Sequence, residues 1–455
     1  MRDRLELRPF QVEGVRFLRE AGRGFLGDEM GLGKSAQLIG ASEGDTLVVA
    51  PSMVLQGGTW VDEIGKWADD PGRFQTVPYT QLAPARSAKL KKEYARPWGT
   101  VIFDEAHYLK GRGTLRTQVG QSLAARAERV YLASGTPIPN YAHELFTLLQ
   151  ILYPHESGPG ARFGSYWRWV GEWFEMAPTR HSKYNVGGLK GCVSECQLRD
   201  PLDPCEHFQR FAAGNMAGKF LRRLRSEVLP ELPGLTERTV STKMGAGQRA
   251  AYRSMKKDMV AEVNGEMVVA WSQSSKHVRL DMLTTGLSML GESVDPADDG
   301  KLDRLRVDLL SRAGGPPTLV MAHYRQTVEA CLGVAQGLGL RAALVHGGTP
   351  GPERTKAVRA FQKGKLDVLV GSLETLSEGV TLIEADMVIF VEKSWKPSRN
   401  EQALYRVHRL GQTKPVTSLD YVTPQSIDVG KREMLATKTD HQIRALTAAE
   451  IVRLA

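Results

Sequence analysis

The sequence has little cysteine and lacks any long apolar run. Its 455 residues include only four cysteines, too few for a disulfide framework in a chain of this length. No stretch approaches the roughly 18 consecutive apolar residues that a membrane-spanning helix needs, and the start MRDRLELRPF has no apolar signal core. These absences argue against disulfide-rich secreted proteins and membrane proteins, and we expect a soluble, intracellular chain.

The length indicates the number of domains, and the charge indicates the kind of partner. Domains usually comprise about 100–200 residues, so we expect two main domains. Lysine and arginine number 60 against 51 aspartate and glutamate residues, which gives a formal net charge of +9 and a pI near 9.3. This excess favours polyanionic partners such as nucleic acid, although a cationic surface alone gives the same balance.

Short apolar runs that end in small or polar residues recur in two series. The first series lies between residues 46 and 137, and the second lies between residues 317 and 423. Helical patterns separate the runs, and this alternation predicts a parallel sheet with helices on both faces. The predicted fold class is therefore α/β, with the same lobe architecture twice.

Few such runs occur in the middle of the chain, which we interpret as helical protrusions and a linker. We expect four segments: lobe 1 at 1–150, its helical protrusion at 151–235 with an insertion at 190–210, a linker with a second protrusion at 236–300, and lobe 2 at 301–455. Four apolar residues of the first protrusion recur at helical spacing: Phe163, Trp167, Val170 and Phe174. This spacing predicts a packed core face rather than a base-stacking platform.

The stretch GDEMGLGKS is similar to a phosphate-binding loop, although Asp28 stands where the strict pattern has its first glycine. Gly31 and Gly33 allow close approach of the backbone to phosphates, and the helix that follows has a dipole that favours anions. Lys34 can then reach the outer phosphates of a nucleotide, and Ser35 can ligate Mg²⁺. A glycine-rich turn with a surface lysine is the alternative for this motif alone.

VIFDEAH places Asp104 and Glu105 at the carboxyl end of a predicted strand, where open α/β sheets bind ligands. Asp104 can hold Mg²⁺ through water, and Glu105 can accept a proton from the water that attacks a γ-phosphate. A helix N-cap is the alternative for this motif alone, but the glycine loop upstream favours catalysis. His107 could connect the pair to moving parts, and the hydroxyls of Ser134 and Thr136 could sense the γ-phosphate.

The stretch EQALYRVHRLGQ, residues 401–412, is typical of a helix. Gln402, Arg406 and Arg409 are spaced i, i+4, i+7, so a helix would place them on one face. Such a face is usually solvated or ion-paired. The second lobe has no phosphate loop of its own, however, which suggests that it donates arginine fingers to a nucleotide held by the first lobe.

Three of the four cysteines lie within one short segment. Cys192, Cys196, Cys205 and His207 have the ligand types and number of a tetrahedral structural zinc site. Their spacing matches no standard zinc finger, so reduced thiols in a surface insertion are the alternative. Zinc would brace the insertion without a catalytic role, because no coordination position stays open. Cys331 lies in a helical pattern and is expected to be buried.

The motifs, taken in order, resemble those of superfamily 2 helicase-like motors, and RVHRLGQ resembles the Swi/Snf-type ATPases in particular. LRPFQVEGVRFL is similar to the adenine-recognising segment, with Gln11 as its glutamine. GDEMGLGKS, VVAPSMVLQGGTW, DEAH and SGTP resemble motifs I, Ia, II and III, and VMAHYR and SLETLSEGVTL resemble motifs IV and V. The compact form with VIFDEAHYLK and EGVTL looks most like the HARP-type annealing helicases. VPYTQL departs from the family's Thr-Ser-Tyr segment.

The resemblance implies two RecA-like lobes in tandem, the P-loop NTPase fold. It implies an ATP- and Mg²⁺-dependent motor that tracks along duplex or branched DNA without reading its sequence, in replication, recombination or repair. A strand-separating helicase is one alternative, and a nucleotide-gated DNA-binding recruitment factor is another. We expect a monomer without a separate domain before Arg8 or after about residue 440, so a partner protein would supply targeting. The compartment would be the nucleus in a eukaryote, or the cytoplasm of a prokaryote or of a virus-infected host.

Each lobe should grip DNA phosphates chiefly through backbone N–H groups and hydroxyls, with basic side chains adding a salt-sensitive contribution. Two runs of basic residues are interpreted as ordinary solvated faces rather than DNA contacts: Lys89, Lys91 and Lys92, and Arg222, Arg223 and Arg225.

Overall fold

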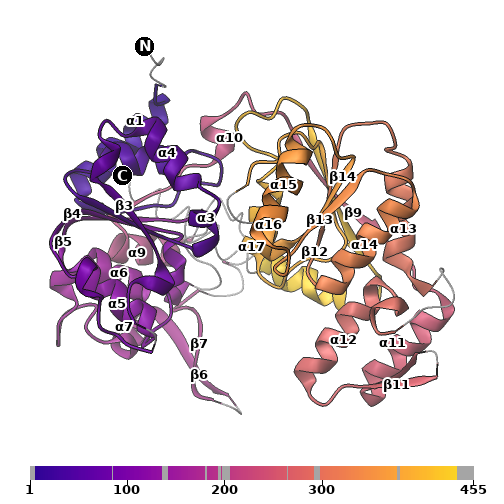
Figure 1. Cartoon of the computed structure of the whole chain (residues 1–455). Helices are drawn as coiled ribbons and strands as arrows, with labels where there is room; N and C mark the ends of the chain where they lie inside the picture. Colours follow the sequence, from indigo (N-terminus) through magenta and orange to yellow (C-terminus); the bar gives the residue numbers. More distant parts are fainter. Residues whose placement is uncertain are drawn as a thin grey trace. The chain divides into compact units, whose positions relative to one another are not determined.

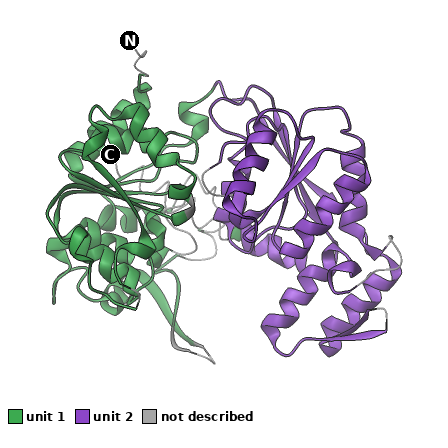
Figure 2. Cartoon of the chain, viewed as in Figure 1, with its two compact units in different colours: residues 1–230, 437–455 green, residues 231–436 purple. Residues whose placement is uncertain are grey.

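The chain divides into two compact units in a computed structural model (Figure 2). Unit 1 comprises residues 1–230 and 437–455, and unit 2 comprises residues 231–436. The structure describes the following residues: 6–84, 86–135, 142–179, 182–192, 196, 205–263, 265–291, 298–376 and 380–437. None of the helices in this part of the chain has the length and apolar character that a bilayer span requires.

Unit 1 is built on a six-stranded parallel sheet in the order β3-β2-β4-β5-β1-β8. Its strands are β1 (Arg23–Leu26), β2 (Thr46–Ala50), β3 (Phe74–Pro78), β4 (Trp98–Asp104), β5 (Ala127–Ala133) and β8 (Phe220–Leu221). Helices cover both faces of the sheet (Figure 1). They are α1 (Pro9–Ala21), α2 (Lys34–Ala41), α3 (Ser52–Gln56), α4 (Thr59–Trp67), α5 (Leu115–Ala124), α6 (Phe146–Leu152), α7 (Tyr166–Trp173), α9 (Glu206–Asn215) and α10 (Arg225–Val228).

Two apolar cores flank the sheet of unit 1, because successive side chains of a strand point to opposite faces. In β4, Val101 and Phe103 join the core that contains residues of α5, α6, α7 and α9. Ile102, between them, joins the core that contains residues of α1, α2 and α4. All three side chains are fully buried. The continuous apolar runs of the sequence are thus typical of strands covered on both faces.

Unit 2 repeats this architecture with a parallel sheet in the order β13-β14-β12-β15-β16-β9. Its strands are β9 (Leu235–Ser241), β12 (Thr318–Ala322), β13 (Ala342–Val345), β14 (Val368–Ser372), β15 (Met387–Phe390) and β16 (Val416–Val422). Its helices are α11 (Ala246–Asp258), α12 (Gln273–Thr285), α13 (Gly300–Leu310), α14 (Arg325–Gly337), α15 (Gly351–Gln362), α16 (Leu373–Leu376) and α17 (Pro397–Leu404). The predicted fold class, two parallel-sheet α/β lobes in tandem, is confirmed.

The middle of the chain contains more strand than the sequence predicts. Unit 1 has an antiparallel hairpin of β6 (Phe174–Thr179) and β7 (Ser182–Leu189), and unit 2 has one of β10 (Val260–Val263) and β11 (Glu266–Val269). β8 pairs with β1, and β9 pairs in parallel with β16 along seven residues. The stretches interpreted as helical protrusion and linker therefore each supply an edge strand to a sheet.

The apolar face predicted around α7 is correct for three residues and wrong for one. Phe163, Val170 and Phe174 are buried, but Trp167 is 46% exposed and Trp169 is buried in its place. Ser165 caps the helix by accepting a hydrogen bond from the backbone of Arg168, so the helix begins at Tyr166. The irregular backbone before Tyr166 shifts the phase of the apolar pattern. Cys331 is fully buried in α14, as predicted.

Candidate functional site

The loop of residues 27–33 connects β1 to α2 and has glycines where the backbone turns left-handed. Gly31 has φ of 85° and Gly33 has φ of 68°, values that favour glycine. A Cβ atom on Gly33 would lie 2.4 Å from Nε2 of Gln11, so a side chain there would displace Gln11 from the loop. The helix α2 begins immediately afterwards at Lys34, and Ser35 lies in its first turn. The loop therefore has the open backbone that phosphate binding requires.

Gln11 of α1 packs directly on this loop. Its Nε2 atom donates to the backbone oxygen of Leu32 at 3.2 Å, and its Oε1 atom accepts from the backbone N–H of Arg8 at 2.9 Å. The side chain is only 6% exposed. The structure thus brings together two segments that the sequence linked to nucleotide binding.

The ammonium group of Lys34 folds back on the loop. Its Nζ atom donates to the backbone oxygens of Asp28 at 2.7 Å and of Glu29 at 3.1 Å. Burial lowers the pKa of Lys34, while the nearby carboxylates of Glu105, Asp28 and Asp104 oppose this shift. Lys34 and the two carboxylates at the end of β4 therefore share one electrostatic environment.

Asp104 ends strand β4 and is held in place by an indole. Its Oδ2 atom accepts from Nε1 of Trp60 at 2.9 Å, and its Oδ1 atom accepts from the backbone N–H of Glu105 at 3.0 Å. Burial and the neighbouring charge of Glu105 raise the pKa of Asp104 to about 6. A buried carboxylate with a raised pKa gains from a nearby cation, which is what a metal ligand requires.

Glu105 has a left-handed backbone, with φ of 49° and ψ of 52°, which is uncommon for a residue other than glycine. Its Oε2 atom accepts from Ser134 at 2.9 Å and forms an ion pair with Nδ1 of His107 at 3.2 Å. Burial raises the pKa of Glu105, but His107, Lys34 and Ser134 lower it to about 2. Glu105 thus contacts both His107 and Ser134 directly, a set of contacts that the sequence did not predict, whereas Thr136 lies outside the described residues.

Two more residues support this site, and the sequence did not single them out. Tyr79 is 5% exposed, and its hydroxyl donates to the backbone oxygen of Asp104 at 2.9 Å. It belongs to the VPYTQL segment, which the family resemblance matched only loosely. Gly135 lies beside the lysine, because a Cβ atom there would lie 3.5 Å from Nζ of Lys34 and 2.5 Å from Met30.

Asp28, which replaces the first glycine of the strict loop pattern, is the centre of a buried network. It is fully buried, and its carboxylate accepts from Nε and Nη2 of Arg223 at 3.0 and 2.6 Å and from Nε2 of Gln37 at 3.0 Å. Arg223 also donates to Oε1 of Gln37 at 2.7 Å and to the backbone oxygen of Phe10. The network ties the loop to α1, α2 and the segment after β8.

The prediction of a solvated face at 222–225 is wrong for two arginines. Arg223 is 5% exposed and Arg225 is 7% exposed. Arg225 pairs with Glu29 of the loop at 3.3 Å, and its backbone N–H donates to the same carboxylate at 2.7 Å. Buried charges need partners, and the partners here lie about 195 residues earlier in the chain. The charge of neighbouring residues in the sequence therefore could not show that these two arginines are buried.

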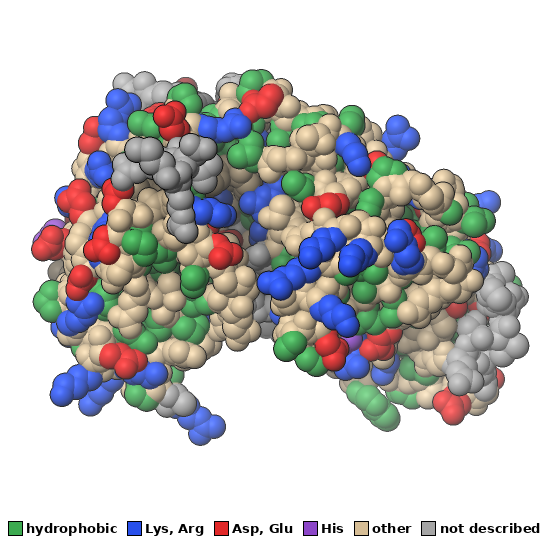
Figure 3. Space-filling view, turned by 45° about the horizontal axis from the view of Figure 1, so that its top comes forward, with side chains coloured by type: hydrophobic (Ala, Val, Ile, Leu, Met, Phe, Trp, Pro, Cys, Tyr) green, Lys and Arg blue, Asp and Glu red, His purple; other side chains and the backbone are tan. Residues whose placement is uncertain are grey.

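Acidic and basic side chains are both present on the face that Figure 3 shows, where several lysine and arginine side chains lie next to one another. Lys89 and Lys92 are exposed, in agreement with the predicted solvated face.

The helix predicted through the C-terminal arginines is wrong. α17 ends at Leu404, and residues 405–409 form turns, so Gln402, Arg406 and Arg409 do not share one helix face. Gln402 is buried within α17. The side chain of Gln412 explains the turns, because its Nε2 atom donates to the backbone oxygens of residues 383, 385 and 407. These bonds replace the continued helical pattern.

Both arginines instead belong to a segment bonded to residues 381 and 382 within unit 2. Nη1 of Arg409 donates to Oγ1 of Thr381 at 2.9 Å. The backbone oxygen of Arg406 accepts from the backbone N–H of Leu382 at 2.8 Å. The arginines are thus attached to the stretch that resembles motif V.

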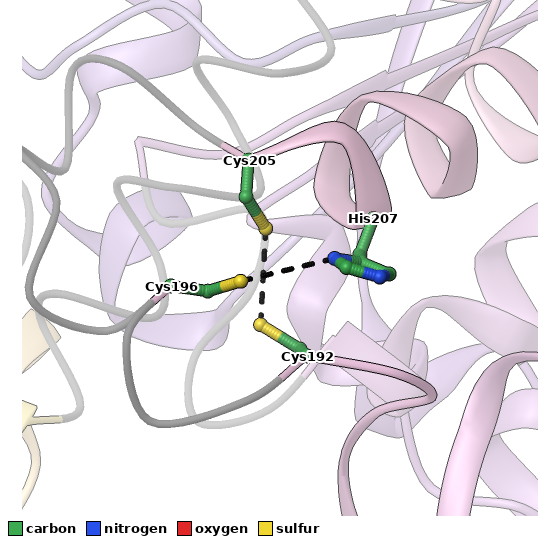
Figure 4. Close-up of side chains that lie close together, drawn as sticks. All are labelled: Cys192, Cys196, Cys205 and His207. Carbon is green, nitrogen blue, oxygen red and sulfur yellow. Dashed lines mark hydrogen bonds between the residues drawn. The ribbon is translucent and has the colours of Figure 1, made fainter.

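The predicted Cys/His cluster is assembled in the structure (Figure 4). The ligand atoms of Cys192, Cys196, Cys205 and His207 all lie within 4.8 Å of one another. The Sγ atoms of Cys192 and Cys205 are 3.8 Å apart, and Sγ of Cys196 is 3.9 Å from Nδ1 of His207. All four side chains point to a common centre in Figure 4.

Comparisons with known proteins find two family models that match parts of this chain. Residues 76–286 match the family model described as SNF2-related domain, and residues 300–411 match the helicase conserved C-terminal domain. The chain is similar to the DNA annealing helicase and endonuclease ZRANB3 of Mus musculus, with 26% identity over 91% of this chain and 38% of the relative.

A second curated relative and one solved structure are also similar to this chain. The chain is 27% identical to the SWI/SNF-related matrix-associated actin-dependent regulator of chromatin subfamily A-like protein 1 of Xenopus laevis, over 92% of this chain and 43% of the relative. It thus spans less than half the length of these curated relatives. Among solved structures, the Sulfolobus solfataricus SWI2/SNF2 ATPase core in complex with dsDNA is 19% identical with a TM-score of 0.40, over 99% of this chain and 96% of that chain.

Proposed function

Because the SNF2-related and helicase C-terminal family models match successive parts of the chain, we propose that it is an SNF2-type, DNA-dependent ATPase that moves along duplex or branched DNA. The observation that carries the proposal is the carboxylate pair at the end of β4, which shares its electrostatic environment with Lys34. A role in replication, recombination or repair is part of the proposal.

We assign ATP binding to unit 1. The backbone of the 27–33 loop and the ammonium group of Lys34 would hold the phosphates, and the lysine would exchange two backbone oxygens for phosphate oxygens. Gln11 would contact the adenine. Ser35 and Asp104 would hold Mg²⁺, which neutralises phosphate charge when bound. The raised pKa of Asp104 supports this assignment, because a cation would relieve the burial of its charge.

We assign the water-orienting role to Glu105. Its pKa of about 2 keeps the carboxylate ionised at neutral pH, so that it can accept a hydrogen bond and then a proton from the attacking water. Ser134 and His107 hold this carboxylate in one orientation. Its left-handed backbone fits a strained functional position.

We assign completion of the hydrolysis site to Arg406 and Arg409 of unit 2, with Gln402 as a further candidate. Unit 2 supplies no phosphate loop after its own central strand, since β12 continues through His323 and Tyr324 directly into α14. The bonds from the arginine segment to residues 381 and 382 support coupling to DNA. A DNA phosphate gripped by that stretch would move both arginines with it.

Translocation can be tested by displacement of a triplex third strand, because a motor that tracks along duplex DNA removes such a strand without unwinding the duplex. We expect ATP-dependent displacement by the natural chain. Lys34→Ala should lower displacement and ATP hydrolysis at least about 100-fold and leave DNA binding unchanged, because the proposed role of the lysine is to contact phosphates of the nucleotide and not DNA. Lys66→Ala, at an exposed position of α4, serves as the matched control.

Other outcomes distinguish the alternatives. Unwinding of a forked substrate without triplex displacement would indicate a strand-separating helicase. DNA binding that responds to ATP without turnover would indicate a nucleotide-gated recruitment factor. Wild-type turnover by Lys34→Ala would contradict the assignment of the ATP site.

A further inference from the structure

Two separations in the Cys/His cluster are close to those of a tetrahedral zinc site, and all four ligand atoms lie within 4.8 Å of one another. With zinc–sulfur bonds of about 2.3 Å, two thiolates on one zinc ion lie about 3.8 Å apart. The Sγ atoms of Cys192 and Cys205 are separated by 3.8 Å, and Sγ of Cys196 is 3.9 Å from Nδ1 of His207. The Sγ–Sγ separation is too long for a disulfide bond, and all four cysteines of the chain are free.

The ligand chemistry selects a particular class of metal. Three thiolates and one imidazole are soft and borderline ligands, which bind zinc and exclude Mg²⁺ and Ca²⁺. Four protein ligands fill all positions of a tetrahedral ion, so no position stays open for water or substrate. We propose that unit 1 binds one structural zinc ion through Cys192, Cys196, Cys205 and His207.

The surroundings of the cluster fit a closed site. Cys205 is 3% exposed, and Cys192 and Cys196 pack against the large apolar core of unit 1. The imidazole of His207 lies close to the backbone of residue 191, which is a glycine. A Cβ atom on this residue would lie 3.0 Å from Nε2 of His207. Gly191 also has φ of 76°, which favours glycine. An apolar shell of this kind keeps water from the metal–sulfur bonds.

The zinc ion would join two elements that are separated along the chain. Cys192 follows β7, the second strand of the β6–β7 hairpin, whereas Cys205 and His207 stand at the start of α9. Hairpin and helix also form walls of a cavity of about 640 Å³, lined among others by Val186, Leu189 and Phe208. Zinc would therefore fix the hairpin, and with it one wall of this cavity, to the core of unit 1.

Metal analysis of the purified chain tests the proposal directly. We expect one zinc ion per chain after expression with added zinc. Cys192→Ala and His207→Ala should lose the metal, whereas Cys331→Ala, the matched control in unit 2, should retain it. His207→Cys should also retain zinc, because four thiolates bind it as well as three thiolates and an imidazole.

Chelation of the natural chain provides a second readout that does not depend on folding of a variant. Removal of zinc should lower the unfolding temperature by several degrees, and restored zinc should recover it. Cobalt in its place should give the absorption of a tetrahedral thiolate complex. A chain without stoichiometric zinc whose unfolding temperature does not respond to added zinc would overturn the proposal. Lys34→Ala should keep its zinc, so failure of the ATPase assignment is distinguishable from failure of this one.

Discussion

Replacing Arg409 by alanine will lower the rate of ATP hydrolysis by about 10³-fold or more, while ATP binding to the chain stays near the wild-type level. An arginine that stabilises the charge of the transferring phosphate acts mainly in the transition state and contributes little to nucleotide binding. The guanidinium of Arg409 lies in unit 2, bonded to Thr381, and the residues that we assign to ATP binding lie in unit 1. Steady-state turnover and equilibrium binding of a fluorescent ATP analogue measure the two effects separately.

Arg359→Ala is the matched control for this experiment, because Arg359 is an exposed arginine of α15 in the same unit. It should hydrolyse ATP at the wild-type rate. An Arg409→Ala chain that is folded by circular dichroism and still turns over ATP normally would refute the role of unit 2 in hydrolysis.

Replacing Arg223 by methionine will destabilise unit 1 by about 3–5 kcal/mol, because it leaves the carboxylate of Asp28 buried without its main partner. The change also removes bonds from the guanidinium to Gln37 and to the backbone of Phe10. Denaturant unfolding followed by tryptophan fluorescence measures the loss. Six of the eight tryptophans lie in unit 1, at positions 60, 67, 98, 167, 169 and 173.

Arg96→Met provides the contrast, since Arg96 pairs with Asp45 on the surface and exposed pairs contribute about 0–1 kcal/mol. The double variant Asp28→Leu, Arg223→Met should recover part of the lost stability, because it removes both buried charges. Equal losses for Arg223→Met and Arg96→Met would show that the buried network does not stabilise the loop.

The linear motifs predicted the glycine loop and the carboxylates at the end of β4 because each motif is short and its geometry is local. A loop with left-handed backbone at two positions favours glycine there, as at Gly31 and Gly33. Asp104 and Glu105 are placed by the end of a strand. Both features can be recognised from a few consecutive residues. The parallel sheets followed from apolar runs, since strands buried on both faces contain few polar residues.

The predictions that were wrong concern residues whose structure depends on contacts with distant parts of the chain. Burial of Arg223 depends on Asp28, which no local pattern connects to it. The turn at Arg406 and Arg409 depends on the side chain of Gln412, which bonds to backbone oxygens of an earlier segment. Strand β9 was missed because most of its residues are polar and exposed, so it has no apolar run although it pairs with β16.

The Cys/His cluster is an intermediate case. The residue types predicted the ligands and their number, but a spacing that matches no standard zinc finger left reduced thiols as an equal interpretation. Only the folded positions of β7 and α9 bring Cys192 and His207 to the same centre. The types of the ligands can thus be predicted from the sequence, whereas their arrangement around one centre depends on the tertiary fold.

We propose above that this chain hydrolyses ATP in response to DNA. The most direct test is the rate of ATP hydrolysis by the purified chain without DNA and with equal concentrations of duplex, forked and single-stranded DNA. We predict a low rate without DNA and a strong increase with duplex or forked DNA of any sequence, which falls as salt is raised. A rate that is the same with and without DNA would show that the chain is not a DNA-dependent ATPase.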